Sequence, residues 1–222
     1  MEALKELTVS SEEATIMLVD DHPLFRSGLR QLIALEEGLQ VICEYSNGTD
    51  AIEGAVEHDP DLIILDLNMQ GINGLETVRQ MREKGVTSRV VMLTVSDNED
   101  DVLNAISSGA DGYLLKDMEP EDIVTNIKQA VLGQLALSDR LTKVLLQSCN
   151  KAKKPAQESP LKALTSRELE ILSLISKGMS NKLIAHELNI TDSTVKVHVK
   201  NLLKKLNVGS RLEAAVWMID NH

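Results

Sequence analysis

The chain has 222 residues, of which 43% are hydrophobic, 26% are charged and only 2% are aromatic. These values are ordinary for a globular protein, and its cores must be built mainly from aliphatic side chains. No apolar run approaches the roughly 18 residues that a membrane helix needs, and the N-terminus carries Glu2, Glu6, Glu12 and Glu13, unlike a secretory signal peptide. We therefore expect a cytoplasmic protein without a membrane partner.

The net charge of −11 would by itself argue against a nucleic-acid partner, but it hides a split along the chain. Residues 1–140 hold 27 acidic and 10 basic residues, a net of −17, whereas residues 141–222 hold 7 acidic and 13 basic residues, a net of +6. Such asymmetry indicates two domains with different partners, and a basic domain suits a polyanion. The bland alternative is a bipolar distribution that only aids solubility.

The first part of the chain alternates short apolar runs with segments of helical periodicity. The apolar runs predict buried strands at 16–19, 39–43, 62–65, 90–93 and 113–115. The segments between them predict a helix that begins at Pro23, helices at 51–56 and 74–82, a helix that ends at Gly109, and a helix at 120–132. Repeated units of this length predict an α/β domain over 15–133, with a doubly wound five-stranded parallel sheet, after an N-terminal tail at 1–14.

The chain changes character after this domain. Residues 134–160 permit one short helix around Leu141, Val144 and Leu145, and then hold two prolines without apolar periodicity, which is typical of a linker. Residues 161–222 have a purely helical pattern, which opens on a capping-box sequence from Thr165 to Glu168.

Polar residues follow the predicted strands at the points where they end. Asp20 and Asp21 follow the first strand, Asp66 the third, Thr94 the fourth and Lys116 the fifth. The carboxyl ends of parallel strands meet at one edge of the sheet, where ligands bind. Three carboxylates in one crevice need a cation, and oxygen ligands of this kind suit Mg²⁺. A carboxylate can also act as a nucleophile, and Asp66 is centrally placed for that role.

This set resembles the receiver domain of two-component response regulators. The resemblance is carried by Asp20-Asp21, by Leu65-Asp66-Leu67-Asn68-Met69 with Gly74, by Thr94, and by Tyr113-Leu114-Leu115-Lys116. It implies a flavodoxin-like domain that is phosphorylated on Asp66 by a partner histidine kinase. It also implies that Mg²⁺ is held by Asp21, Asp66 and the backbone carbonyl of Asn68, assisted by Asp20. Lys116 would stabilise the phosphoryl oxygens, Thr94 would be the switch hydroxyl, and Tyr113 would move with it.

Two positions depart from the receiver pattern. Gln70 and Asp117 stand where proline often occurs, and we expect neither to touch the phosphoryl chemistry. His22 neighbours the acids, but Mg²⁺ prefers oxygen ligands, so we interpret it as a loop histidine.

The C-terminal part contains a helix-turn-helix pattern, with a first helix at 181–188 and a recognition helix at 192–206. Lys196 and Lys200 are four residues apart and share one outward face, with Val197 beside them to contact a thymine methyl. Asn181 and Lys182 begin the preceding helix, whose positive end suits a phosphate. The expected DNA-binding set also includes Thr191 and Ser193 at the start of the recognition helix. A surface lysine stripe without a ligand is the alternative.

The helical segment resembles the LuxR-type DNA-binding domain, through Leu164–Leu172, Gly178–Ala185 and Thr191–Leu206. Together with a receiver, this is the arrangement of the NarL/FixJ family, and the stretches 109–122 and 193–200 resemble its nitrate/nitrite regulators. The resemblance implies a non-enzymatic transcription regulator that binds promoter DNA as a homodimer, acts with RNA polymerase, and controls anaerobic respiration genes.

Two other functions remain open from the residues alone. One is an effector that binds RNA or protein, and the other is an aspartyl-phosphate phosphatase, although Asn68 stands where such an enzyme carries its general acid. For the regulator we expect an unphosphorylated state in which the receiver covers the recognition helix and hides Lys196, Val197 and Lys200. Phosphorylation would then shift the population toward a released helical domain.

Overall fold

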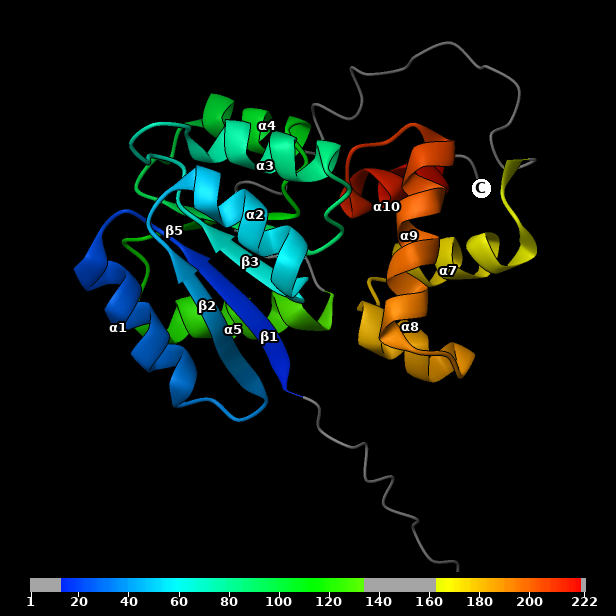
Figure 1. Cartoon of the computed structure of the whole chain (residues 1–222), viewed down its shortest axis with the longest axis horizontal. Helices are drawn as coiled ribbons and strands as arrows, with labels where there is room; N and C mark the ends of the chain where they lie inside the picture. Colours follow the sequence, from blue (N-terminus) through cyan, green and yellow to red (C-terminus); the bar gives the residue numbers. More distant parts are fainter. Residues whose placement is uncertain (1–12, 134–162, 221–222) are drawn as a thin grey trace, which may run out of the picture.

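The computed structural model of the chain describes residues 13–133 and 163–220, which form an α/β domain and an all-helical domain (Figure 1). The expected linker, its short helix and nearly all of the expected N-terminal tail lie outside the described residues. The expected fold class is confirmed in both domains.

The α/β domain is a five-stranded, fully parallel sheet in the order β2-β1-β3-β4-β5. Its elements alternate strand and helix along the chain, as the apolar pattern predicts. They are β1 (Ala14–Val19), α1 (Pro23–Ala34), β2 (Leu39–Tyr45), α2 (Gly48–His58), β3 (Leu62–Leu65), α3 (Gly74–Glu83), β4 (Arg89–Thr94), α4 (Glu99–Ser107), β5 (Gly112–Leu115) and α5 (Pro120–Leu132).

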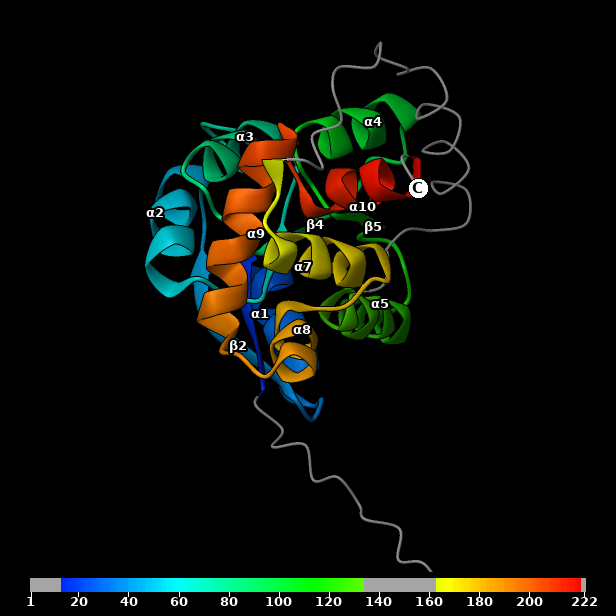
Figure 2. The ribbon, with the colours of Figure 1, turned by 90° about the vertical axis from the view of Figure 1, so that its right-hand side faces the viewer.

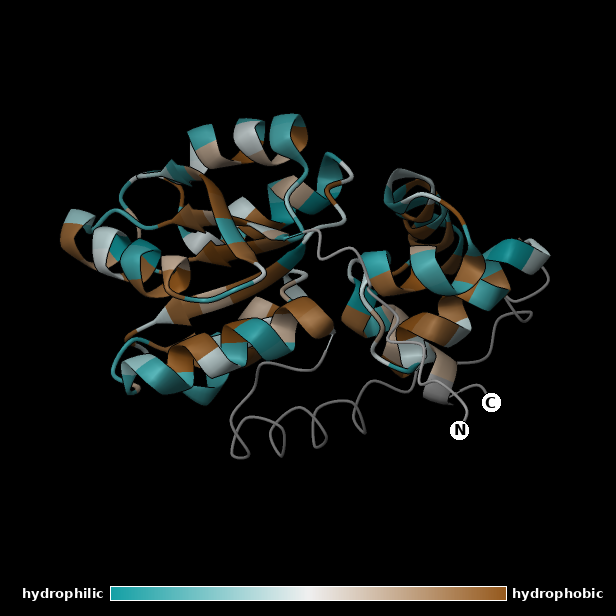
Figure 3. Ribbon diagram, turned by 90° about the horizontal axis from the view of Figure 1, so that it is seen from below, coloured by the Kyte–Doolittle hydropathy of each residue, from teal (hydrophilic) through white to brown (hydrophobic). Residues whose placement is uncertain are grey.

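Helices cover both faces of the sheet, because successive side chains of each strand point to opposite faces. Met17 and Val19 of β1 pack with α2, α3 and α4 in one core, whereas Ile16 and Leu18 pack with α1 and α5 in the other. Coloured by hydropathy, the strands are mostly hydrophobic, whereas the helices carry both hydrophobic and hydrophilic residues (Figure 3). Both faces of the sheet are thus buried under helices. A functional site on this domain is therefore expected at one of the two ends of the strands.

The predicted helix at 51–56 is longer in the structure, where α2 covers Gly48–His58. The Asn47 side chain accepts a hydrogen bond from the Asp50 backbone N–H, which caps the helix a turn earlier than the apolar pattern starts. The helix ends on Asp59, which adopts a left-handed conformation with φ 43°. The other element boundaries differ from expectation by a few residues at most.

The helical domain comprises α7 (Ser166–Ser176), α8 (Asn181–Leu188), α9 (Asp192–Leu206) and α10 (Arg211–Asp220). The expected capping box is present, since Glu168 accepts from the Thr165 N–H at 2.7 Å and Thr165 Oγ1 accepts from the Glu168 N–H at 3.3 Å. Val195, Val199 and Leu202 of α9 are buried in the core of this domain. None of the helices in the described part of the chain has the length and apolar character to cross a lipid bilayer.

The helical domain lies beside the amino ends of the strands, at the opposite end of the sheet from the predicted acidic site (Figure 1). Figure 2, in which this domain faces the viewer, shows α9 beside α2. The two domains approach closely at Gly133, after α5, and Gly178, between α7 and α8. A Cβ at Gly133, where φ is +105°, would lie 1.4 Å from the Gly178 carbonyl oxygen. Only glycine permits this contact.

Candidate functional site

The predicted acidic residues meet at the carboxyl ends of the strands. Asp20 and Asp21 follow β1 and Asp66 follows β3, and with His22 their ligand atoms all lie within 4.8 Å of one another. Asp20 and Asp66 are buried. The backbone here is held tightly, because a Cβ at Gly74, the first residue of α3, would lie 2.3 Å from the Asp66 carbonyl oxygen. The sheet therefore gathers three carboxylates in one crevice.

Lys116, which follows β5, provides the neighbouring positive charge. Its Nζ lies 2.8 Å from Asp20 Oδ2 and 2.9 Å from Asp66 Oδ2. The ammonium also lies over the ring of Phe25, 4.8 Å from its centre, a cation–π contact. Burial raises the pKa of Asp66 and Lys116 counteracts it, while the negative charge of Asp20 raises it further. Lys116 thus pairs with two of the three carboxylates and leaves Asp21 without this cation, and the hard-oxygen donor set suits a divalent cation.

Asp21 is held from the loop after β3. Its Oδ2 accepts a hydrogen bond from the Gln70 backbone N–H at 3.1 Å. A proline at position 70 could not donate this bond. This departure from the receiver pattern therefore supplies a hydrogen-bond donor to one carboxylate of the site, whereas its expected lack of a part in the phosphoryl chemistry remains a prediction.

His22, interpreted from the sequence as a loop histidine, contacts two carboxylates of the acidic crevice. Its Nδ1 lies 2.9 Å from Asp21 Oδ1 and 3.3 Å from Asp20 Oδ1, although its side chain is 67% exposed. Asp117, the other departure, follows Lys116 through a trans peptide bond, and the structure contains no cis bond among its described residues.

Thr94 and Tyr113 lie on the neighbouring strands β4 and β5 and are linked through Ser96. Thr94 Oγ1 accepts from the Ser96 N–H at 3.2 Å, and the Tyr113 hydroxyl donates to the Ser96 carbonyl at 2.9 Å. Both side chains are fully buried, and burial raises the pKa of Tyr113 to about 12. The Tyr113 ring is therefore already buried in this conformation, and its predicted movement with Thr94 remains a prediction.

Sequence reasoning missed Phe25, Gln70 and Ser96 as neighbours of the site. Phe25 carries a signal, since it is the single phenylalanine of the chain and lies one helical turn from the acids. Gln70 and Ser96 make their contacts through backbone atoms, which every residue type carries, so the sequence could not indicate them.

The helix-turn-helix forms as predicted from α8 and α9. Thr191 caps α9, since its Oγ1 accepts from the Thr194 N–H at 3.3 Å, and Ser193 Oγ lies 3.0 Å from the same oxygen. Ser180 caps α8 in the same way. The two caps fix the residues at which α8 and α9 begin. Because one side of α9 is buried in the core of its domain, Lys196 and Lys200 lie on the other side of the helix.

Two lysines of the expected DNA-binding set are paired with carboxylates of the receiver. Lys196 Nζ lies 2.9 Å from Asp59 Oδ2, at the end of α2, and also donates to the Asp59 backbone carbonyl at 2.9 Å. Lys182 Nζ lies 3.1 Å from Asp61 Oδ2 and donates to the Glu13 carbonyl at 2.7 Å. The acidic first domain therefore supplies the countercharge that the charge split suggests.

The expected covering of the recognition helix is only partly correct. The Lys196 side chain is 14% exposed and is therefore covered. Lys200 lies against Gly85, where a Cβ would be 2.5 Å from Lys200 Cε, but it stays exposed, against expectation. Val197, however, is 59% exposed, so the expectation that it is hidden is wrong. Asn181 is engaged within its own domain, where its Oδ1 accepts from Arg211 Nη1. The receiver thus covers the N-terminal lysine of the pair and leaves the outermost apolar side chain open.

Comparison with known proteins agrees with this division into two domains. Residues 16–128 match the model of the response regulator receiver domain, and residues 162–218 match that of bacterial regulatory proteins of the luxR family. The chain is 52% identical to the nitrate/nitrite response regulator protein NarL of Escherichia coli, over 94% of this chain and 96% of that one. It is 46% identical to NarP of the same organism, over 92% and 94%.

Among solved structures, it is similar to a LuxR-family two-component response regulator from Aurantimonas sp., with a TM-score of 0.57 and 31% identity. That match covers 62% of this chain and 99% of the other. A receiver joined to a LuxR-type domain makes a phosphorylation-dependent regulator of transcription. The chain belongs to the NarL/FixJ family of two-component response regulators.

Proposed function

We propose that Asp66 is the phosphoryl acceptor and that its phosphorylation releases α9 from the receiver to bind promoter DNA. The observation that carries this proposal is the ion pair between Lys196 and Asp59, because it engages a recognition-helix lysine in the unphosphorylated chain. A lysine paired at 2.9 Å with a carboxylate is not available to a phosphate or a base edge.

The chemistry at Asp66 is an in-line transfer. A carboxylate oxygen of Asp66 attacks the phosphorus of a phosphohistidine on the kinase, an O–P bond forms, and the N–P bond breaks. The electron pair of the broken bond goes to the imidazole nitrogen, which takes a proton. Lys116 is close enough to stabilise the new phosphoryl oxygens, since it already lies 2.9 Å from Asp66 Oδ2. Thr94 supplies a hydroxyl at the end of the adjacent strand.

A divalent cation fits the acidic crevice. Asp21, Asp66 and the Asn68 carbonyl would hold Mg²⁺ with Asp20 assisting, since all are hard oxygen donors and a single lysine does not balance three carboxylates. When bound, Mg²⁺ supplies positive charge that offsets the negative charge of the transferring phosphoryl group.

The interdomain contacts give the switch its two states. Closed, the chain keeps Lys196 and Lys182 on receiver carboxylates; open, it presents them to DNA, together with Val197, Lys200, Asn181, Thr191 and Ser193. Phosphorylation biases this equilibrium only if the phosphorylated receiver fits the helical domain less well. The released domain would bind paired half-sites as a homodimer.

The similarity to NarL and NarP supports a further assignment. We infer a partner histidine kinase that responds to nitrate or nitrite, target promoters of anaerobic respiration, contact with RNA polymerase, and action in the cytoplasm. The match covers 96% of NarL and 94% of NarP, so both the receiver and the DNA-binding domain of each relative have a counterpart in this chain.

The test is the affinity of the full-length protein for a promoter duplex, at fixed salt, with and without acetyl phosphate and Mg²⁺. We expect about a tenfold or larger gain with the phosphodonor, absent in Asp66→Asn and kept in Asp97→Asn, which removes an exposed carboxylate outside the crevice. A full gain in Asp66→Asn would refute the acceptor assignment. Equal affinity in all states would refute the closed-state mechanism.

A further inference from the structure

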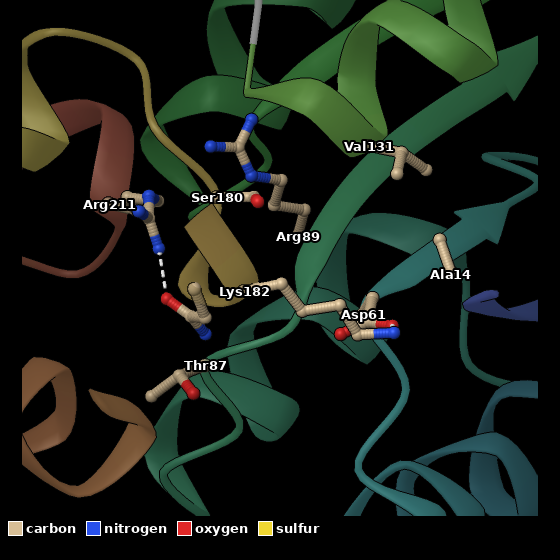
Figure 4. A pocket seen from close by; sticks show the side chains of 9 residues that line it. Ala14, Asp61, Thr87, Arg89, Val131, Ser180, Lys182 and Arg211 are labelled. Atoms are coloured by element: carbon tan, nitrogen blue, oxygen red, sulfur yellow. Dashed lines mark hydrogen bonds and ion pairs between the residues drawn. The ribbon is translucent and has the colours of Figure 1, made fainter. Parts of the chain in front are cut away.

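A small cavity lies between the two domains, and seven of the nine residues that line it are polar or charged (Figure 4). Its volume is about 30 Å³, which is room for about two waters or one small ion. The receiver contributes Ala14, Asp61, Thr87, Arg89 and Val131, and the helical domain contributes Ser180, Asn181, Lys182 and Arg211. Because each domain forms part of the wall, the cavity exists only when the domains are together.

Arg211, the first residue of α10, is the most deeply buried charge in this wall, with 6% exposure. Its two terminal nitrogens donate to the Asn181 side chain and the Met179 carbonyl. Its Nε is buried and has no hydrogen-bond partner among the described residues. A buried donor without an acceptor is costly, and a buried guanidinium without a counter-ion more so.

A second guanidinium reaches the same place from the receiver. Arg89, the first residue of β4, donates to the Ala130 carbonyl at 3.0 Å and to the Met179 carbonyl at 3.5 Å, so both arginines converge on one carbonyl oxygen. Neither arginine has an ion-pair partner within residues 13–133 and 163–220. Burial lowers the pKa of both, and repulsion from Arg89 contributes to lowering that of Arg211 to about 9.

The remaining charges do not compensate this pair. Lys182 adds a third cation, near the positive end of α8. Asp61 is already engaged, since its Oδ2 accepts from the Thr15 N–H at 2.8 Å and the Thr15 hydroxyl at 2.9 Å and lies 3.1 Å from Lys182. Asp111, whose charge raises the pKa of both arginines, is paired with Arg82 at 2.8 Å, and Asp192, whose charge raises that of Arg211, is paired with Lys196 at 3.2 Å.

We propose that this interdomain cavity binds a small inorganic anion, of the size of chloride or nitrate, between Arg89 and Arg211. The anion would accept a hydrogen bond from the buried Arg211 Nε. It would also offset the repulsion between the positive charges of Arg89 and Arg211, which come from different domains. Larger anions such as gluconate exceed the volume available.

An occupied cavity would stabilise the closed arrangement by mass action. A ligand that binds one state only shifts the equilibrium by a factor of one plus its concentration over its Kd, which is about elevenfold at ten times the Kd. The effect on DNA binding rests on the proposed function, whereas anion binding itself does not.

The direct test is the chlorine NMR line width of the full-length, unphosphorylated protein. We expect saturable broadening in sodium chloride that nitrate removes and gluconate at equal ionic strength does not. The broadening should disappear in Arg89→Gln, which changes only the receiver wall, and in Arg211→Gln if circular dichroism shows that this variant folds. It should persist in Arg79→Gln, which removes an exposed arginine of α3.

A second measurement follows the consequence for the domains. The affinity of the unphosphorylated chain for duplex DNA should fall severalfold when chloride or nitrate replaces gluconate at constant ionic strength, and Arg89→Gln should lose this dependence. Broadening of equal size in Arg89→Gln, or displacement by gluconate, would overturn the anion site. Specific broadening without any change in DNA affinity would keep the site and instead overturn the release mechanism.

Discussion

The ion pair between Lys196 and Asp59 allows the proposed closed state to be weakened without altering the residues proposed to bind DNA. Asp59→Asn removes the carboxylate charge but keeps the shape, and asparagine tolerates the left-handed backbone found there. The Asp59 side chain is 50% exposed and the Lys196 side chain 14%. An exposed pair contributes about 0.2–1 kcal/mol, and the covered lysine places this one in the upper half of that range. The backbone carbonyl of Asp59 still accepts from Lys196 in the variant.

A loss of about 0.5–1 kcal/mol raises the open fraction, and hence the apparent DNA affinity of the unphosphorylated chain, by about two- to fivefold. Fluorescence anisotropy with a promoter duplex at fixed ionic strength measures this, since the salt concentration itself changes the affinity. Glu57→Gln is the matched control, because it removes an exposed charge from the same helix, and no ion pair or hydrogen bond joins Glu57 to α9 among the described residues. The phosphorylated forms should differ little. Equal affinities of Asp59→Asn and Glu57→Gln without phosphorylation would refute the reasoning.

Three other substitutions test the fold and the acidic crevice. Because burial raises the pKa of Asp66, the folded protein binds that proton more tightly than the unfolded chain, and stability is lost as the pH rises through the folded pKa. Asp66→Asn should therefore increase the free energy of unfolding at pH 7 without Mg²⁺, and the gain should vanish as the pH falls toward 3.8; a gain independent of pH would contradict this. Thr165→Ala should cost about 1 kcal/mol in urea unfolding through loss of the α7 cap, whereas no loss would mean that Glu168 alone holds the helix end. Tyr113→Phe should cost about 0.5–1.5 kcal/mol, because the Ser96 carbonyl loses its donor, and unchanged stability would show that water replaces the hydroxyl.

The acidic crevice could be predicted because its members share one rule of topology. Asp20, Asp66 and Lys116 each follow an apolar run, and parallel strands bring such positions to one edge whatever the details of packing. The contact of Gln70 with Asp21 could not be predicted in this way, because it is made by a backbone N–H whose direction depends on the loop conformation.

For the interdomain contacts, the sequence predicts only that an acidic domain and a basic domain attract each other, and not which residues meet. Asp59 and Asp61 stand in an ordinary helix-to-strand turn, and nothing in their residue type indicates that they meet Lys196 and Lys182. Which side of the recognition helix is covered depends on how two rigid bodies dock, so the sequence placed Val197 inside the interface when its side chain is exposed. Arg89 and Arg211, 122 positions apart, gave no signal at all.

Two central strands connect the crevice and the interface directly. β3 is flanked by Asp61 at its amino end and Asp66 at its carboxyl end, and β4 begins at Arg89 and ends at Thr94. Each behaves as a stiff rod of roughly 17 Å, held in register by neighbours on both sides. Because a strand keeps its length and its register with its neighbours, a displacement of Thr94 along β4 would move Arg89 together with the adjacent strands. The ion pairs and hydrogen bonds at the amino ends of these strands depend on short distances, so we expect even a small displacement at the phosphoryl end to weaken the contacts between the domains.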